Sequence, residues 1–399
     1  MLMLTNPQRL LVLFAALQAF ASLSVDISLP ALPAIAQDLA ASEGVTQGTI
    51  SIFSLGMCLG MLVFGPLSDK YGRRRLMLAG IVLYIIVTIG CVFAQSVDSL
   101  IVLRFLQAVG GAAAAVLSRA IVRDVFAPPE VPRVLSLMQL VSMLAVMIAP
   151  LLGSYILSLG SWRWIFGFLA VFSVVTGMLA YWKIPETHQQ ENRADSLRAT
   201  FLSYWHIYTD PKGLGYVLMM ALCFSGMFAY ITVSPFVFIE FYGLTTVQFS
   251  LIFGVNSFGI MLLSMLNARL VRACGAQTML RLGSFICLLS GLVLLASALL
   301  DNHFWLLLLG LFGAVSCVGL MGANATASLM QLYPRTAGAA AGLAVASQFG
   351  IGALIAMGAS AMYDGTPLAM ILVVALCGLA VPLFYQLTRL PGQAAHKTL

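Results

Sequence analysis

Long runs of apolar residues follow one another along this chain, separated by short stretches that contain charged residues, proline or glycine. An α-helix needs about 20 mostly apolar residues to cross the hydrocarbon core of a bilayer. The pattern therefore predicts twelve membrane-spanning helices, at residues 9–33, 47–67, 76–94, 98–120, 133–158, 163–183, 214–237, 247–268, 278–299, 303–328, 337–361 and 367–389.

The longest polar stretch, residues 185–213, divides these helices into two sets of six. The sequence predicts an N-terminal six-helix bundle at 1–184, a cytoplasmic linker at 185–213 and a C-terminal six-helix bundle at 214–399. Within the linker, "SLRATFLSYW" (196–205) fits either a short amphipathic helix on the membrane surface or a solvated loop. The sequence leaves both interpretations open.

A weak internal repeat supports two similar halves. "GPLSDKYGRRRLMLAG" (65–80) follows the second predicted helix, and "ARLVRACGAQTMLRLG" (268–283) follows the eighth. Aligning the two segments superposes Gly72 on Gly275. Two like halves repeated along the chain are typical of transporters that rock around a central binding site.

Composition excludes a soluble protein and charge indicates the orientation. Hydrophobic residues make up 61% of the 399 residues and charged residues 9%, against roughly 45–50% and ~25% in soluble domains. Lysine and arginine gather in the loops after even-numbered helices, which predicts cytoplasmic termini and a cytoplasmic linker. The basic residues of these loops are Lys70, Arg73–Arg75, Arg123, Arg133, Lys183, Arg193, Arg198, Lys212, Arg272 and Arg335.

Several functional classes lack support. The basic residues form no patch with interleaved aromatics, so no nucleic-acid partner is expected. The seven cysteines are scattered singly, which favours core packing over disulfides or a metal site. The phosphate-binding, zinc-protease and serine-hydrolase motifs are missing, so we expect no enzyme, no catalytic residue and no metal or organic cofactor. A channel is disfavoured because no stack of charge rings is visible.

Two charged residues stand inside otherwise apolar helices, Asp26 in 9–33 and Arg104 in 98–120. A charge at a helix centre costs ~2.5–3.5 kcal/mol on insertion scales unless it faces a cavity or a partner. One interpretation is a buried ion pair that only fixes helix packing. The other is a titratable site, because burial raises the pKa of a carboxyl group and a nearby arginine lowers it, so a conformational change can load and release a proton.

The sequence resembles the major facilitator superfamily over nearly its whole length. The loop "GPLSDKYGRRR" is similar to the superfamily's signature after the second helix, and "LRFLQAVGGAAAA" (103–115) to the fourth-helix motif of its proton-coupled drug antiporters. "SVDISLPALPAI" (24–35) and "SPFVFIE" (234–240) resemble the bicyclomycin/chloramphenicol-resistance branch. This resemblance implies an all-α fold of two six-helix bundles, alternating access, and export driven by inward proton flow.

By this resemblance, Asp26 couples protons to substrate and Arg104 supports it, with Gln107, Gly110 and Gly111 completing the fourth-helix motif. The resemblance further implies a cytoplasmic conformational latch. Its residues are Gly65, Asp69, Gly72 and Arg73, and we expect Asp124 to pair with Arg73 or Arg74. In the second half Arg272 replaces the acid that matches Asp69, so the latch is asymmetric.

The fifth-helix antiporter motif is only approximate. Ala149, Pro150 and Gly153 preserve small side chains around a proline, while Ser154 and two alanines replace glycines. Aromatic residues and mid-span amides offer substrate contacts for moderately sized, partly polar molecules. The candidate cavity residues are Gln139, Phe228, Tyr230, Ser234, Phe236, Asn256, Asn324 and Gln348.

These features together predict a monomeric multi-pass transporter of the bacterial inner membrane, with protons as coupling ion, a small-molecule substrate and the lipid bilayer as surroundings. The expected activity is multidrug efflux, for example of bicyclomycin- or chloramphenicol-type antibiotics. A dedicated carrier of an amino acid, nucleoside or sugar remains an alternative, and a membrane-embedded enzyme or channel a more distant one.

Overall fold

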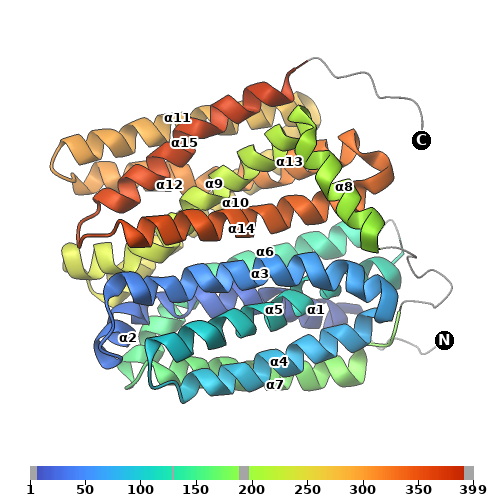
Figure 1. Cartoon of the computed structure of the whole chain (residues 1–399), viewed down its shortest axis with the longest axis horizontal. Coiled ribbons are helices and arrows are strands. Elements are labelled where there is room, and N and C mark those ends of the chain that lie inside the picture. The colour runs from blue at the N-terminus through green and yellow to red at the C-terminus, as the bar shows by residue number, and fades with distance from the viewer. Residues whose placement is uncertain (1–6, 128–129, 188–196, 391–399) are drawn as a thin grey trace. The chain divides into compact units, whose positions relative to one another are not determined.

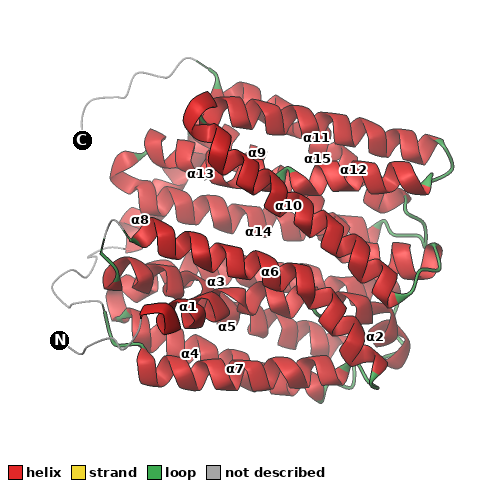
Figure 2. Cartoon of the chain, turned by 180° about the vertical axis from the view of Figure 1, so that it is seen from behind, coloured by secondary structure: helices red, strands yellow, loops and turns green. Residues whose placement is uncertain are grey.

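The computed structural model describes residues 7–127, 130–187 and 197–390. Within these ranges every regular element is helical, as the uniform red ribbons of Figure 2 show. Twelve helical segments there are long and apolar enough to cross a membrane. The predicted all-α, twelve-span fold is thereby confirmed.

The first half of the chain contains α1 to α7 (Figure 1). Their bounds are α1 (Pro7–Asp26), the 3₁₀ turn η1 (Leu29–Ala31), α2 (Leu32–Asp38), α3 (Glu43–Tyr71), α4 (Arg73–Val92), α5 (Val97–Val125), α6 (Val131–Ser158) and α7 (Arg163–Lys183).

The second half follows with α8 to α15. These are α8 (Leu197–Thr209), α9 (Pro211–Pro235), the π-helix η3 (Phe236–Phe241), α10 (Thr246–Cys274), α11 (Ala276–Leu299), α12 (Phe304–Ser316), α13 (Val318–Leu332), the 3₁₀ turn η4 (Pro334–Thr336), α14 (Ala337–Ala361) and α15 (Leu368–Thr388).

The chain forms two compact units that do not coincide with its two halves. Unit 1 comprises Met1–Leu197, Ile231–Ser257 and Ser360–Thr366, and unit 2 comprises Arg198–Tyr230, Phe258–Ala359 and Pro367–Leu399. Unit 1 thus includes the end of α9, η3 and the first turns of α10. The predicted boundaries at 184 and 214 come from the position of the linker in the sequence, whereas the two units are defined by which residues contact one another in space.

Small residues let the helices of unit 1 pack closely. A methyl group added at Gly60 of α3 would lie 2.5 Å from the Cβ of Ala112 in α5, and one at Gly80 of α4 would lie 3.0 Å from the Gly110 carbonyl oxygen. Backbones that approach this closely gain van der Waals contact, which is the main attraction between helices in lipid. The glycine- and alanine-rich fourth-helix motif therefore makes α5 the helix around which α3 and α4 pack.

The first predicted span is interrupted, where the sequence analysis expected one helix over 9–33. Helix α1 ends at Asp26, a turn and η1 follow, and α2 resumes at Leu32. Pro30 explains the break, because it has no backbone N–H to donate to the Asp26 carbonyl oxygen four residues earlier. Pro33 lies in the first turn of α2, where a proline is tolerated. The seventh and tenth spans are also irregular, since α9 continues into η3 and α12 is separated from α13 at Cys317.

The linker contains a helix, which resolves one open alternative. Helix α8 covers residues 197–205 of the segment for which a short helix and a solvated loop were both possible, so the helix is confirmed, whereas its position on the membrane surface stays a prediction. The helix belongs to unit 2 from Arg198 onward, and a 2.6 Å hydrogen bond between the Tyr208 and Ser347 hydroxyls joins it to α14. At its end the Tyr333 hydroxyl donates to the Asp210 carboxylate. The pKa of the Tyr333 hydroxyl is raised, mainly because the residue is partly buried and secondly because of its hydrogen bond to the negatively charged Asp210.

Candidate functional site

Asp26 is the last residue of α1, and its side chain is enclosed. The residue is 4% exposed, and among the described residues its carboxyl group takes part in no ion pair or hydrogen bond. The break in the helix that follows Asp26 lies against α6. A methyl group added at Gly153 would lie only 1.9 Å from the Ile27 carbonyl oxygen, so the two backbones touch at this point. Asp26 therefore sits at an irregular, tightly packed joint between α1 and α6.

Arg104 of α5 is buried beside the preceding turn of α1 instead. Its Nη1 donates to the Ser24 carbonyl oxygen at 3.0 Å and to Gln107 Oε1 at 2.8 Å. Gln107 Nε2 in turn donates to Thr88 Oγ1 of α4 at 2.8 Å. The guanidinium also lies 4.5 Å from the centre of the Phe53 ring, a cation–π contact. Arg104 thus connects α1, α3, α4 and α5.

The ion pair that was one of the two interpretations of Asp26 and Arg104 is not formed. Within the described part of the chain no salt bridge joins Arg104 to Asp26, and Arg104 Nη2 is buried without a hydrogen-bond partner. The interpretation of these two residues as a packing ion pair is therefore wrong for this structure. Instead, Arg104 holds the Ser24 carbonyl, two residues before the acid, which positions the end of α1 without neutralising Asp26.

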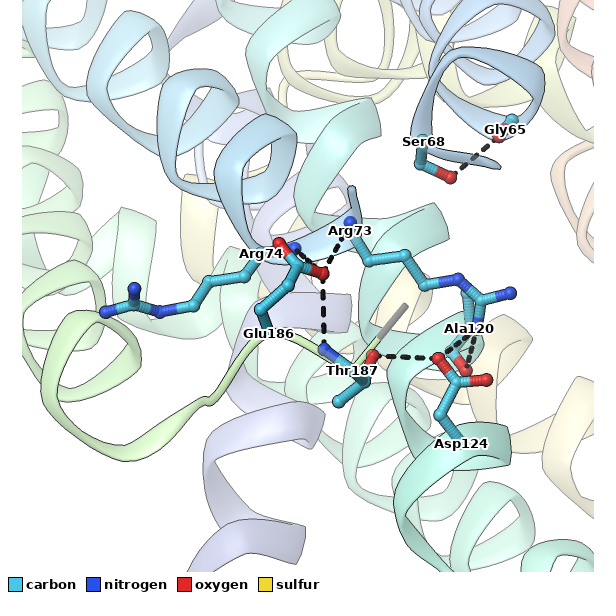
Figure 3. Close-up of polar contacts among 8 residues, drawn as sticks. All are labelled: Gly65, Ser68, Arg73, Arg74, Ala120, Asp124, Glu186 and Thr187. Carbon is cyan, nitrogen blue, oxygen red and sulfur yellow. Dashed lines mark hydrogen bonds and ion pairs between the residues drawn. The ribbon is translucent and has the colours of Figure 1, made fainter. Parts of the chain in front are cut away.

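The latch residues that the structure describes lie at the junction of α3, α4 and α5 (Figure 3). Gly72 adopts φ +97°, which glycine tolerates and other residues rarely adopt, and it separates α3 from α4. Arg73 forms an ion pair with Asp124 and donates to the Ala120 carbonyl oxygen at 2.8 Å. Gly65 accepts a 2.7 Å hydrogen bond from the Ser68 hydroxyl. The side chain of Asp69 lies outside the described residues.

Glu186, which the sequence analysis did not single out, binds the N-terminus of α4. Its Oε1 accepts hydrogen bonds from the backbone N–H groups of Arg73 at 2.9 Å and Arg74 at 3.4 Å. A carboxylate is favoured there because the first N–H groups of a helix are unpaired and carry partial positive charge. The neighbouring Thr187 hydroxyl donates to Asp124 Oδ2 at 2.8 Å. The start of the linker is thereby attached to the latch.

The approximate fifth-helix motif makes specific contacts in unit 1. Ala149 and Pro150 are buried on α6, and the Ser250 hydroxyl of α10 donates to the Pro150 carbonyl oxygen at 3.0 Å. Ser154, one of the residues that replaces a glycine, donates to Thr246 Oγ1 at 2.6 Å. The replacement therefore adds a hydrogen bond between α6 and α10.

Gln139 of α6 belongs to a second polar chain in unit 1. Gln18 Nε2 of α1 donates to Gln139 Oε1 at 3.1 Å. Arg119 Nε of α5 donates to Gln18 Oε1 at 3.4 Å. Three spanning helices thus share one polar connection on the side of α1 that precedes the Asp26 break. Arg119 and Gln18 were not among the predicted site residues.

The other candidate cavity residues are divided between the units. Ser234, Phe236 and Asn256 are buried in unit 1. In unit 2, Asn324 Nδ2 donates to Asn267 Oδ1 at 2.6 Å, so this mid-span amide has a partner helix. Tyr230 is also buried in unit 2.

Unit 2 contains a cluster of phenylalanines, one of which, Phe224, lines a small hollow. Phe228 packs against Phe224 and Phe349 with ring centres 5.0 and 5.6 Å apart. Gln348 lines a hollow of about 40 Å³ together with Phe224, Cys223 and Met220. A space of this size holds one or two water molecules and no drug-sized ligand.

Some of the polar residues that the sequence analysis did not select had a simple signal in the sequence. Gln18, Arg119 and Asn267 are polar residues within apolar runs, the same signal that identified Asp26 and Arg104. Glu186 had no such signal, because an acid in a polar linker is unremarkable until the fold brings it to a helix end.

Comparison with known proteins identifies related sequences. The family model described as Major Facilitator Superfamily matches residues 14–357. A bicyclomycin resistance protein homolog from Haemophilus influenzae is 34% identical over 369 residues, covering 91% of this chain and 92% of that protein. A chloramphenicol resistance protein from Pseudomonas aeruginosa is 31% identical over 281 residues, covering 69% of this chain and 65% of that protein.

Solved structures share the fold at much lower identity. The xylose transporter XylE from E. coli has a TM-score of 0.74 and 14% sequence identity, covering 98% of this chain and 99% of that chain. At this identity the likeness establishes the fold alone.

Proposed function

Because the chain belongs to the major facilitator superfamily, we propose that it exports small organic molecules, antibiotics among them, in exchange for protons. The observation that carries the coupling mechanism is Asp26, at a break in the first spanning helix. Its residue is 4% exposed, and its carboxyl group has no ion-pair partner among the residues that the structure describes. The substrate class is supported by relatives named for bicyclomycin and chloramphenicol resistance.

The proposed coupling uses the irregular joint at Asp26. A carboxyl group that is enclosed can exchange a proton only when water or another proton carrier reaches it. Proton release therefore requires a movement that admits water, and the break between α1 and η1 is a position at which such a movement costs few backbone hydrogen bonds. Arg104, anchored to the Ser24 carbonyl oxygen, keeps the end of α1 in place while Asp26 changes protonation.

The proposed surroundings follow from the distribution of basic residues. We infer a multi-pass protein of the bacterial inner membrane with both termini and the linker in the cytoplasm, because lysine and arginine concentrate in the loops after even-numbered helices. One chain carries both sets of six helices, which supports a monomer as the transporting unit.

Substrate-induced proton movement tests the proposal. In energised everted membrane vesicles, adding chloramphenicol should release protons from the acidified interior, measured as recovery of a pH-sensitive dye. Asp26→Asn should abolish this response, because the amide cannot carry the coupled proton.

The matched control is Asp301→Asn. Asp301 is exposed in a turn with φ 53°, a conformation that asparagine also tolerates. This variant should respond like the wild type. An Asp26→Asn protein that exchanges drug for protons at the wild-type rate would exclude Asp26 from the mechanism, and an absent response in the wild type would exclude this substrate.

A further inference from the structure

A polar hollow lies between the ends of α11 and α15, which pack side by side in unit 2 (Figure 1). Its volume is about 360 Å³ and it is open to the surface. The first turns of α11 and the last turn of α15 supply its lining. The lining residues are Gln277, Thr278, Arg281, Tyr385, Thr388 and Arg389. None of them belongs to the proposed coupling site or latch.

The two arginines give this hollow a positive charge that no acidic side chain among the described residues balances. Arg281 and Arg389 are both exposed, and neither forms an ion pair within the described residues. The acidic residues of unit 2 are Asp210 and Asp301. Asp210 accepts the Tyr333 hydroxyl, and Asp301 follows the opposite end of α11. Two arginines that flank an open hollow without an acid are suited to an anion.

The hydrogen-bonding groups favour a phosphate. Guanidinium groups present paired donors that match phosphate oxygens. Thr278 lies in the first turn of α11, where unpaired backbone N–H groups also favour negative charge. On the other side of the hollow the Thr388 hydroxyl is occupied, since it donates to the Tyr385 carbonyl oxygen at 2.7 Å. The anion is therefore expected nearer to α11.

An exposed apolar face continues from the arginine along α11. Phe285, Leu289 and Leu292 follow Arg281 at helical spacing and are 61%, 52% and 50% exposed. On α15, Leu383 is 63% exposed. A phosphate group held at the helix end would thus have its attached chains lying along this apolar face. A free anion would gain nothing from these side chains.

We propose that this hollow binds the phosphate of an anionic phospholipid, whose acyl chains lie along the exposed face of α11. The inference rests on the orientation proposed above, which puts this basic end at the cytoplasmic leaflet. Basic pockets between spanning helices on that side are suited to anionic headgroups.

Purified full-length protein in detergent tests the site with three probes: phosphatidylglycerol, phosphatidylcholine and inorganic phosphate. Phosphatidylglycerol should raise the melting temperature of the wild type more than phosphatidylcholine, and inorganic phosphate should have little effect. In Arg281→Gln/Arg389→Gln the response to phosphatidylglycerol should fall to that of phosphatidylcholine. Native mass spectrometry should show a matching loss of retained phosphatidylglycerol.

The control is Arg269→Gln/Arg272→Gln, which removes the same charge from the end of α10 without touching the lining. It should keep the wild-type response. If the first variant does not fold, Arg281→Gln and Arg389→Gln tested singly should each weaken the response, and Arg281→Lys should preserve more of it.

Three results would overturn the proposal. They are an unchanged response in the lining variants, equal responses to both lipids, and full stabilisation by inorganic phosphate alone. Because binding is measured without transport, a failed Asp26 experiment leaves this result interpretable.

Discussion

A single missing side chain, that of Gly153, allows α6 to touch the break after Asp26. Any Cβ there would lie 1.9 Å from the Ile27 carbonyl oxygen and 3.3 Å from Pro30 Cγ. The first of these neighbours is backbone, which cannot rotate away as the end of a flexible side chain can. The geometry around the proposed proton site therefore depends on this glycine as much as on the acid itself.

Gly153→Ala should accordingly destabilise the protein and displace the joint. Overpacking of this kind typically costs about 1–3 kcal/mol, which should lower the melting temperature of the purified protein. Gly167→Ala on α7 is the control, because nothing lies within 4 Å of a Cβ added there. It should be neutral or stabilising by up to about 1 kcal/mol. Equal melting temperatures for the two variants would contradict the close backbone contact.

Individual residues also show which features of the candidate site could be predicted from the sequence. Asp26 and Arg104 could be chosen from the sequence as candidate site residues, because charge in an apolar run is costly wherever the helix points. Their partners were not predictable, since a partner depends on helix rotation and on a break whose length sequence does not specify. Arg104 binds the Ser24 carbonyl oxygen, whereas an ion pair with Asp26 was only one of the two interpretations of the sequence.

At the scale of elements, the start of α4 shows how a polar linker is joined to a spanning helix. Glu186 accepts the first N–H groups of α4, and Thr187 donates to Asp124. Glu186 and Thr187 thus cap the start of α4 and fasten the linker to α5. The loop signature predicted a turn with Asp124 paired to an arginine, and the structure supplies Arg73 as that partner.

Glu186→Gln should weaken this attachment. The amide retains an acceptor but loses the negative charge that the helix N-terminus favours, a term worth about 0.3–1 kcal/mol at an exposed site. We expect a small drop in melting temperature that diminishes as salt is added, because screening already weakens the charge term in the wild type.

Glu130→Gln provides the comparison for that variant. Glu130 is an exposed acid at the start of α6 whose side chain makes no capping hydrogen bond. The same loss of charge should therefore have a smaller effect. A larger effect at Glu130 would mean that overall charge, and not capping, accounts for the result.

The sequence predicted the positions of the helices better than it predicted the breaks within them. Twelve apolar runs of sufficient length fixed the number of spans, because the bilayer sets a common length. The break after Asp26 had a signal in Pro30. The interruption at Cys317 is flanked by Gly313 and Gly319, but glycines also lie inside unbroken helices such as α5, so they did not predict it. Packing against neighbouring helices decides such breaks.

At the scale of the whole molecule, the compact units cross the boundary between the sequence halves. The repeat and the linker predict halves that meet at 185–213. Unit 1 nevertheless includes the beginning of α10, where Thr246 and Ser250 bond to α6. Contacts of this kind involve a few side chains far apart in the sequence, so no local sequence pattern predicts them.

Alternating access, which the family resemblance implies, requires these α6–α10 contacts to break and re-form in each cycle. Replacing both Ser154 and Thr246 by cysteine should allow a disulfide, because the hydroxyl oxygens that the sulfurs would replace are 2.6 Å apart, close to the S–S bond length of about 2.0 Å. Oxidation should then stop drug-for-proton exchange in vesicles, and a thiol reductant should restore it. Ser154→Cys and Thr246→Cys alone, which contain the same seven native cysteines, should be insensitive to the oxidant. Exchange that continues at the full rate in protein verified as cross-linked would mean that α6 and α10 stay together throughout transport, and the movement that exposes Asp26 would have to be sought within α1 alone.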